Sequence, residues 1–262
     1  MNANYLFHLW RRNWIKVAAV TCGCLLWGFL APVIDKSLVS TVQGALPSSL
    51  ANFGSGTLNT FPGVITLMFE HPFLIALVST VALAITIPAL AGQRQRGTLE
   101  MLLARPIKRT TLVATVAVGV ASMLLLVLFA MVVGILAGSS VEGLSDQVPV
   151  RELLIVWLWS ALLYGAFASF ALAASATSNR NGPAVSWTLG FLIANYFFEI
   201  LGGFWDQAKA WQPYSLFHHF QAADILAGRL SAADLIVLSL AVVIPLTYAL
   251  YIFPRRDLPA PD

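Results

Sequence analysis

Charged residues are scarce in this sequence. Only 10% of its 262 residues are Asp, Glu, Lys or Arg, whereas soluble domains carry about 25%. Hydrophobic residues make up 58%, and the mean hydropathy is +0.79. This composition excludes a soluble globular protein. We therefore expect an all-α integral membrane protein, and at about 20 residues per span the chain accommodates six spans in a single transmembrane domain over residues 1–262.

Several enzyme motifs are missing as well. The sequence contains no P-loop of the form GxxxxGKS or GxxxxGKT, no HExxH, no GxSxG and no CxxC. These motifs would bind nucleotide phosphates, hold zinc, present a nucleophilic serine or pair two thiols. We therefore expect a chain that is not itself an enzyme, with no catalytic residue, no metal site and no bound cofactor.

The sequence contains one pair of adjacent histidines, His218 and His219, which could be considered for a metal site. Adjacent residues on a helix diverge by about 100°, which suits a shared metal poorly. We interpret both as interfacial histidines, with a metal site on the outer face as the alternative. The basic residues lie beside apolar runs rather than on one continuous face, which argues against nucleic-acid binding.

Six long apolar runs predict the membrane spans. We place them at residues 15–34, 70–91, 110–138, 151–177, 184–204 and 233–253. Residues 6–14, LFHLWRRNW, are amphipathic at helical spacing, with His8, Arg11 and Arg12 opposite the apolar side chains. Residues 1–14 are therefore predicted to form an interfacial helix. Residues 35–69 are expected to be an irregular loop with one short helix, and the aromatic segment 205–232 is expected to lie on or dip into the outer interface.

Lys and Arg are unevenly divided between the two sides of the predicted membrane. Segments 1–14, 92–109, 178–183 and 254–262 share one side, which together with Lys16 holds eleven of the 15 Lys and Arg. The other side holds the remaining four, Lys36, Arg151, Lys209 and Arg229. Because cytoplasmic loops of membrane proteins are enriched in Lys and Arg, we expect both termini in the cytoplasm.

The segment between the second and third spans is the most distinctive part of the chain. Residues 92–109 read GQRQRGTLEMLLARPIKR, a short basic island between two apolar runs. Thr98 can cap a helix, Leu99 begins a stripe with helical spacing, and Pro106 ends the pattern. The segment therefore predicts a short cytoplasmic helix that docks a partner. The stripe consists of Leu99, Leu102 and Leu103.

This segment resembles the cytoplasmic signature of bacterial type-2 ABC exporter permeases. That signature reads approximately E-x-E-x-G-T-L-E-x-L-L-x-x-P, then Ile, Ser or Val, any residue and Arg. Gln93 and Gln95 stand where the family has its paired glutamates. The number and spacing of the spans extend the resemblance over nearly the whole chain. The matching positions are Gly97, Thr98, Leu99, Glu100, Leu102, Leu103, Pro106 and Arg109.

The resemblance implies a membrane-spanning permease subunit of an ATP-driven ABC exporter. It implies two copies of a separate cytoplasmic ATPase, which bind ATP and Mg, and a second permease chain in a homodimer or a related heterodimer. It places the chain among the lipids of the bacterial inner membrane, where it moves an unidentified substrate. An ABC-type membrane subunit with a signalling or assembly role, and a secondary transporter or channel, remain the alternatives.

Two sets of residues are the predicted functional site. The first couples the permease to the ATPase, and the second, Asn195 and Glu199, lies one helical turn apart in the fifth span and is a candidate substrate pathway. Inserting an acid at the bilayer centre costs about 2.5–3.5 kcal/mol, so the presence of Glu199 indicates a functional role. The alternative interpretation is that Glu199 lies near the outer end of the span, where it is hydrated or protonated and has no role in transport. The coupling set is Arg94, Arg96, Gly97, Thr98, Leu99, Glu100, Leu102, Leu103, Pro106 and Arg109.

Two shorter patterns complete the expectations. Gly134 and Gly138 form a GxxxG motif at the end of the third span, which permits close helix contact. We interpret it as packing within the chain, with a dimer seam as the alternative. Residues 179–183, NRNGP, predict a tight cytoplasmic turn, with a minor second contact to the ATPase as the alternative.

Overall fold

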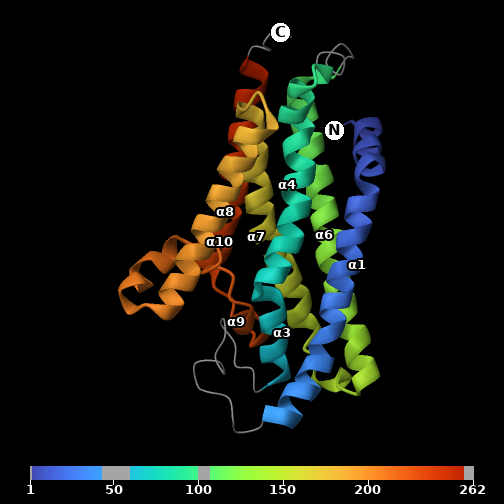
Figure 1. The fold of residues 1–262 in the computed structure, drawn as a ribbon, viewed down its shortest axis with the longest axis vertical. Coiled ribbons are helices and arrows are strands. Elements are labelled where there is room, and N and C mark those ends of the chain that lie inside the picture. Colours follow the sequence, from blue (N-terminus) through green and yellow to red (C-terminus); the bar gives the residue numbers. More distant parts are fainter. Residues whose placement is uncertain (1, 43–59, 100–106, 257–262) are drawn as a thin grey trace.

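The computed structural model describes residues 2–42, 60–99 and 107–256, and within these ranges the chain is helical without strands. Figure 1 shows long helices lying side by side along one axis. The helices are α1 (Ala3–Val42), α3 (Phe61–Glu70), α4 (Pro72–Gln95), α6 (Arg109–Glu142), α7 (Val150–Thr177), α8 (Asn181–Phe204), α9 (Ala222–Leu226) and α10 (Ala232–Arg255), with 3₁₀ turns η1 (Ser145–Gln147) and η2 (Asp206–Tyr214).

Six of the described helices are long and apolar enough to cross a membrane, which confirms the predicted all-α fold with six spans. These segments are Ala3–Ser37, Pro72–Gln95, Arg109–Glu142, Val150–Thr177, Asn181–Phe204 and Ala232–Arg255. Each overlaps one predicted span and extends beyond it at one or both ends. The difference at the ends arises because polar and basic residues can continue a helix after the apolar run has stopped.

Helix α1 differs from the expectation at its start. A separate interfacial helix over residues 1–14 is not confirmed, since α1 runs without a break from Ala3 into the first span. Tyr5, Leu9 and Asn13 are buried on one face of this stretch. The indole Nε1 of Trp10 donates to the Ser122 hydroxyl on α6 at 3.2 Å. Packing against α6 therefore continues α1 past the membrane boundary that the sequence indicated.

Close packing of α1 against α6 depends on glycines from both helices. A Cβ atom on Gly134 would lie 2.1 Å from the carbonyl oxygen of Leu25, and one on Gly28 would lie 2.3 Å from that of Met131. Gly138 approaches Phe29 similarly. Only glycine allows backbones to approach so closely. The predicted role of the GxxxG motif in packing within the chain is therefore confirmed.

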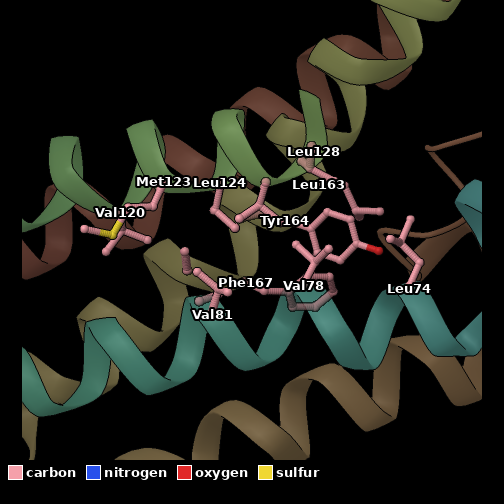
Figure 2. Close-up of a cluster of buried hydrophobic side chains, with 14 of the residues drawn as sticks. Leu74, Val78, Val81, Val120, Met123, Leu124, Leu128, Leu163, Tyr164 and Phe167 are labelled. Atoms are coloured by element: carbon pink, nitrogen blue, oxygen red, sulfur yellow. The ribbon is translucent and has the colours of Figure 1, made fainter. Parts of the chain in front are cut away.

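Helix α7 lies at the centre of the bundle, between α4, α6, α8 and α10. Tyr164 and Phe167 of α7 are fully buried. They pack with side chains from α4 and α6, so that α7 joins the two halves of the bundle (Figure 2). The labelled members of this cluster are Leu74, Val78, Val81, Val120, Met123, Leu124, Leu128, Leu163, Tyr164 and Phe167.

The end of the bundle opposite the chain termini is closed by short elements (Figure 1). Helix α1 extends to Val42 and α3 precedes α4, while residues 43–59 of the predicted outer loop lie outside the described residues. After α8, η2 leads into a segment whose Leu216, Phe217 and Phe220 are buried. Helix α9 then packs against α3 and α7. Part of the aromatic segment 205–232 therefore packs inside the bundle, while its expected place at the outer interface of the membrane stays a prediction.

Candidate functional site

The predicted coupling segment begins as the last turn of α4. Helix α4 ends at Gln95, and Gly97 takes a left-handed conformation with φ of 65°. Its N–H donates to the Arg94 carbonyl at 2.9 Å, as is usual where glycine terminates a helix. The Thr98 hydroxyl donates to the carbonyl and side-chain oxygens of Gln93. Gly97 and Thr98 therefore set the direction in which the chain leaves α4.

Four predicted coupling residues, Glu100, Leu102, Leu103 and Pro106, lie outside the described residues. Of the leucine stripe the structure describes Leu99, which is buried. Arg96, by contrast, is exposed at the helix end. The described part of the coupling segment therefore offers two exposed cations to a partner, Arg96 and Lys108, and turns one leucine toward its own chain.

Arg94 and Arg109 have a different environment from the one expected for docking residues. The Arg94 guanidinium Nη1 donates to the carbonyls of Ala176 and Ser178 at 2.9 and 3.0 Å, at the end of α7. It also lies over the Phe253 ring, 5.0 Å from the centroid. Arginine suits such a position because it can bind the unpaired carbonyls at a helix C-terminus. Arg94 therefore links α4, α7 and α10.

Arg109, at the start of α6, likewise binds the carbonyls at the end of another helix, α10. Its Nη1 donates to the carbonyls of Pro254 and Arg256 at 3.3 and 2.9 Å. Arg256 in turn donates to the carbonyls of Ala176 and Thr177. Sequence analysis did not single out Arg256, because nothing in a local pattern shows which helix ends meet. Three arginines thus bind the ends of α4, α6, α7 and α10 into one basic cluster.

A proline breaks the hydrogen bonding of α4 shortly before this cluster. Pro88 has no N–H, so the Ala84 carbonyl lacks its helical partner; Lys16 Nζ lies 3.4 Å from it. Ser175 of α7 is inserted between the Ile87 carbonyl and the Ala91 N–H of α4, which would otherwise bond to each other. Its hydroxyl donates to the Ile87 carbonyl at 2.7 Å and accepts from the Ala91 N–H at 3.0 Å. Side chains of α1 and α7 therefore satisfy the backbone of α4 around Pro88.

The turn at residues 179–183 packs against the end of α4. The Gln95 side-chain oxygen accepts from the Asn181 N–H at 3.0 Å. Gly92 packs closely at the same contact, since a Cβ there would lie 3.0 Å from Asn181 Oδ1. Gln95 thus supplies an acceptor oxygen at a position where the resembling family has an acid. The turn contacts its own chain through α4, while the predicted contact to an ATPase stays a prediction.

Asn195 of α8 is buried, with 5% of its surface exposed. Its Oδ1 accepts from the Leu216 N–H at 2.8 Å, and its Nδ2 donates to the Phe191 carbonyl at 2.8 Å. The Ser215 hydroxyl donates to the Asn195 backbone carbonyl at 2.9 Å. No hydrogen bond joins Asn195 to Glu199 in the described part of the chain, although they lie one turn apart. Asn195 instead fixes the segment that enters the bundle after η2.

Glu199 lies one turn further along α8 and faces the same segment. The Gln212 amide donates to the Glu199 backbone carbonyl at 3.2 Å and to its carboxylate at 3.5 Å. His218 Nδ1 lies 4.0 Å from the other carboxylate oxygen. Glu199 is thus half-buried beneath η2 rather than directed at lipid alone. Sequence analysis missed Gln212 and Ser215, which are ordinary polar residues until the chain folds back onto α8.

The two histidines have separate partners. His219 Nδ1 lies 2.6 Å from Asp234 Oδ1, and its Nε2 lies 3.0 Å from the Pro213 carbonyl. Burial, followed by the neighbouring His219, lowers the pKa of His218. In the described residues, no group of three His, Cys, Asp or Glu side chains is arranged to hold a metal ion. His219 therefore joins the segment after η2 to α10, whereas His218 lies beside Glu199 of α8.

Comparison with known proteins connects this architecture to one family. A family model described as "ABC-2 family transporter protein" matches residues 11–258. A search of curated proteins finds no match to the chain. The matched region contains nearly all of the six candidate spans together with the basic cluster and the polar residues of α8. The chain therefore belongs to the ABC-2 transporter family and is a multi-pass membrane permease subunit of an ABC transporter.

Proposed function

We propose that this permease is the membrane subunit of an ATP-driven exporter and is driven by a separate cytoplasmic ATPase, present in two copies. The observation that supports this most is the attachment of the coupling end of α4 to two other helices. Arg94 and Ser175 join it to α7, and Gln95 joins it to the start of α8. A displacement of residues 96–109 by the ATPase would therefore be transmitted to several spans together.

The proposed orientation places both termini and the coupling segment in the cytoplasm of a bacterial cell, with the chain in the inner membrane. The start of α1, the end of α4, the start of α6 and the end of α10 lie at the same end of the bundle (Figure 1). Arg94, Arg96, Arg109 and Arg256 gather there. The positive-inside rule favours the cytoplasm for such an end.

A second permease chain, identical or related, is proposed to complete the transporter. Helices α8 and α10 lie at one flank of the bundle (Figure 1) and expose large apolar side chains. Trp187 is 70% exposed and Ile244 is 62% exposed. This flank has enough apolar surface for a partner or for lipid, and the substrate pathway is proposed to lie where the two chains meet.

Asn195 and Glu199 are proposed to control the outer end of that pathway. Both hold residues 212–218 against α8. Leu216 and Phe217 of this segment are buried as well, so its release would break the polar contacts and uncover apolar side chains while α8 itself stays intact, which is the movement proposed for an outer gate. The same contacts explain why an acid is tolerated at this depth, because Gln212 and His218 accompany it.

Co-purification with the ATPase tests the proposed coupling. Arg96→Glu reverses the exposed charge at the end of α4 and should lower recovery of the ATPase by roughly tenfold, since like charges at an interface cost several kcal/mol. Leu102→Asp should act in the same direction. The matched control is Arg255→Glu, because Arg255 is exposed at the same end but bonds to its own helix at the Tyr251 carbonyl.

The control should retain the ATPase. Equal recovery with all three variants would contradict coupling through residues 96–109. Failure of the unaltered permease to retain any ATPase would instead favour a channel or a secondary transporter. If the complex forms and ATP hydrolysis responds to no exported compound, the signalling or assembly role becomes the better explanation.

A further inference from the structure

A groove of about 490 Å³ lies between α1 and α4 at the basic end of the bundle. Two of its lining residues are apolar, and the others are basic or carry an amide or a hydroxyl group. None of the described residues that line it is acidic. The lining residues are Arg12, Asn13, Lys16, Ala84, Pro88, Gln93, Arg96, Thr98 and Asn181.

Three positive charges in this groove have no counter-charge among the described residues. Arg12, Lys16 and Arg96 are exposed, and none of them forms a salt bridge within the described part of the chain. Arg12 and Arg96 come from different helices, so folding brings them together. Like charges held close together repel one another, and an anion between them removes that repulsion.

The groove also offers a neutral donor. The Gln93 side-chain oxygen accepts from the Thr98 hydroxyl, which leaves the Gln93 amide nitrogen available to donate. Guanidinium groups match the oxygens of a phosphate in geometry as well as in charge, while an ammonium group adds a point charge. Arg12, Arg96, Lys16 and Gln93 therefore form a donor set suited to a phosphate group.

The position of the groove indicates where such a phosphate comes from. On α1, Trp14 and Ile15 lie in the same turn as Arg12 and are 60% and 65% exposed. Apolar side chains exposed at this level of a spanning helix face lipid, and aromatic residues mark the headgroup region. Ala84 and Pro88 of α4 add apolar surface to the lining of the groove. A phosphate here would therefore have acyl chains beside it.

We propose that the groove between α1 and α4 binds the phosphate of an anionic phospholipid from the leaflet at the basic end. Basic pockets between spanning helices at the cytoplasmic surface bind anionic headgroups in this way. The lipid would lie directly beside Pro88, where α4 lacks a backbone hydrogen bond, and next to the coupling segment. The proposal rests on the orientation proposed above, but it does not depend on the ATPase.

The test measures lipid retained by the purified full-length permease. The protein is incubated in mixed micelles containing phosphatidylglycerol and phosphatidylcholine, and the lipids that remain bound are quantified by mass spectrometry. Gln93→Glu places an acid inside the groove and should lower retained phosphatidylglycerol by roughly fivefold, the effect of one compensated cation. The side-chain oxygen that accepts from Thr98 is preserved in this variant.

Gln95→Glu is the matched control. It introduces the same charge two residues away, but Gln95 bonds to Asn181 and does not line the groove. It should retain phosphatidylglycerol as the unaltered protein does. Arg12→Gln, at the other wall, should lower retention in the same way as Gln93→Glu. Size-exclusion profiles identify any variant that misfolds. If Gln93→Glu misfolds, the lipid retained by Arg12→Gln tests the proposal in its place.

Three results would overturn the proposal. Equal losses in Gln93→Glu and Gln95→Glu would show a general charge effect, and equal retention of phosphatidylcholine would show that the headgroup charge is not recognised. Displacement of phosphatidylglycerol by millimolar inorganic phosphate would identify a site for free phosphate instead. Lipid retention is measured on the permease alone with the Gln93 and Arg12 variants, so a permease that retains lipid but no ATPase, or ATPase but no lipid, distinguishes the failure of one proposal from the failure of the other.

Discussion

At the scale of single residues, side chains that complete the backbone of another helix have the clearest roles. Ser175 is an ordinary small residue of α7 until Pro88 of α4 lies beside it, and its hydroxyl then bonds to both Ile87 and Ala91. A buried backbone group without a partner is costly in a membrane. Arg94 serves α7 similarly, through carbonyls at its end. These contacts link the coupling end of α4 to the bundle.

Glu199 provides the prediction at this scale. Glu199→Gln keeps the size of the side chain and an acceptor for Gln212, but it removes the charge beside His218. A hydrogen bond to a charged group contributes about 1.5–3 kcal/mol, so a gate that needs the charge should lose roughly tenfold or more of its transport rate. Recovery of the ATPase should stay unchanged.

The matched control for Glu199 is Asp206→Asn, which removes an acid from the same end but from an exposed position paired with Lys209. Transport measured in vesicles should be unaffected by this control. If Glu199→Leu inserts and transports as the unaltered permease does, the proposed gate is refuted. Glu199 would then have no role in transport.

At the scale of helices, the contact between α1 and α6 is the most specific. It needs glycine at three places because backbone meets backbone there. Gly134→Ala would place a Cβ 2.1 Å from the Leu25 carbonyl oxygen, and we expect a loss of about 1–3 kcal/mol of stability from overpacking. Thermal unfolding in detergent measures the effect.

Gly190→Ala provides the comparison for this helix contact. Gly190 also lies within a spanning helix, but no atom lies within 4 Å of the position that its Cβ would take. Alanine should be neutral or stabilising there, by up to about 1 kcal/mol, because it has the higher helix propensity. A melting temperature lowered equally by both substitutions would contradict the glycine contact.

Helices were predicted from the sequence more successfully than the contacts between them. The apolar runs indicated six spans because membrane insertion depends on length and hydropathy. The continuous start of α1 was missed, since polar residues at 11–13 interrupt the apolar run while Leu9 and Trp10 still pack on α6. Arg94 was expected to face a partner, and its binding to carbonyls of α7 depends on tertiary contacts that no local pattern contains.

The candidate site shows the same division between local pattern and tertiary contact. The depth of Glu199 could be estimated by counting residues along the fifth span, but its partners come from residues 212 and 218, where the chain turns back. The spacing of Asn195 and Glu199, one turn apart, does not show which partners their side chains take. The buried N–H of Leu216 takes the Asn195 side-chain oxygen, because a buried backbone donor needs a partner more than an adjacent acid does.

At the scale of the whole molecule, the two ends of the bundle differ in chemistry. The end that contains the described chain termini joins its helices through arginines and carbonyls. The opposite end joins them through buried aromatic residues, amides and acid–histidine pairs. In the account proposed here, the first end receives the movement of the ATPase and the second opens to release substrate.

Cross-linking to the ATPase tests this account most directly. Cys22 and Cys24 are replaced by alanine, and a single cysteine is placed either at Arg96, exposed at the basic end, or at Ser145, exposed in η1 between α6 and α7. The account predicts a permease–ATPase cross-link from position 96, changed in yield by ATP, and none from position 145. A cross-link from position 145 but not from position 96, in a complex that still contains the ATPase, would contradict it.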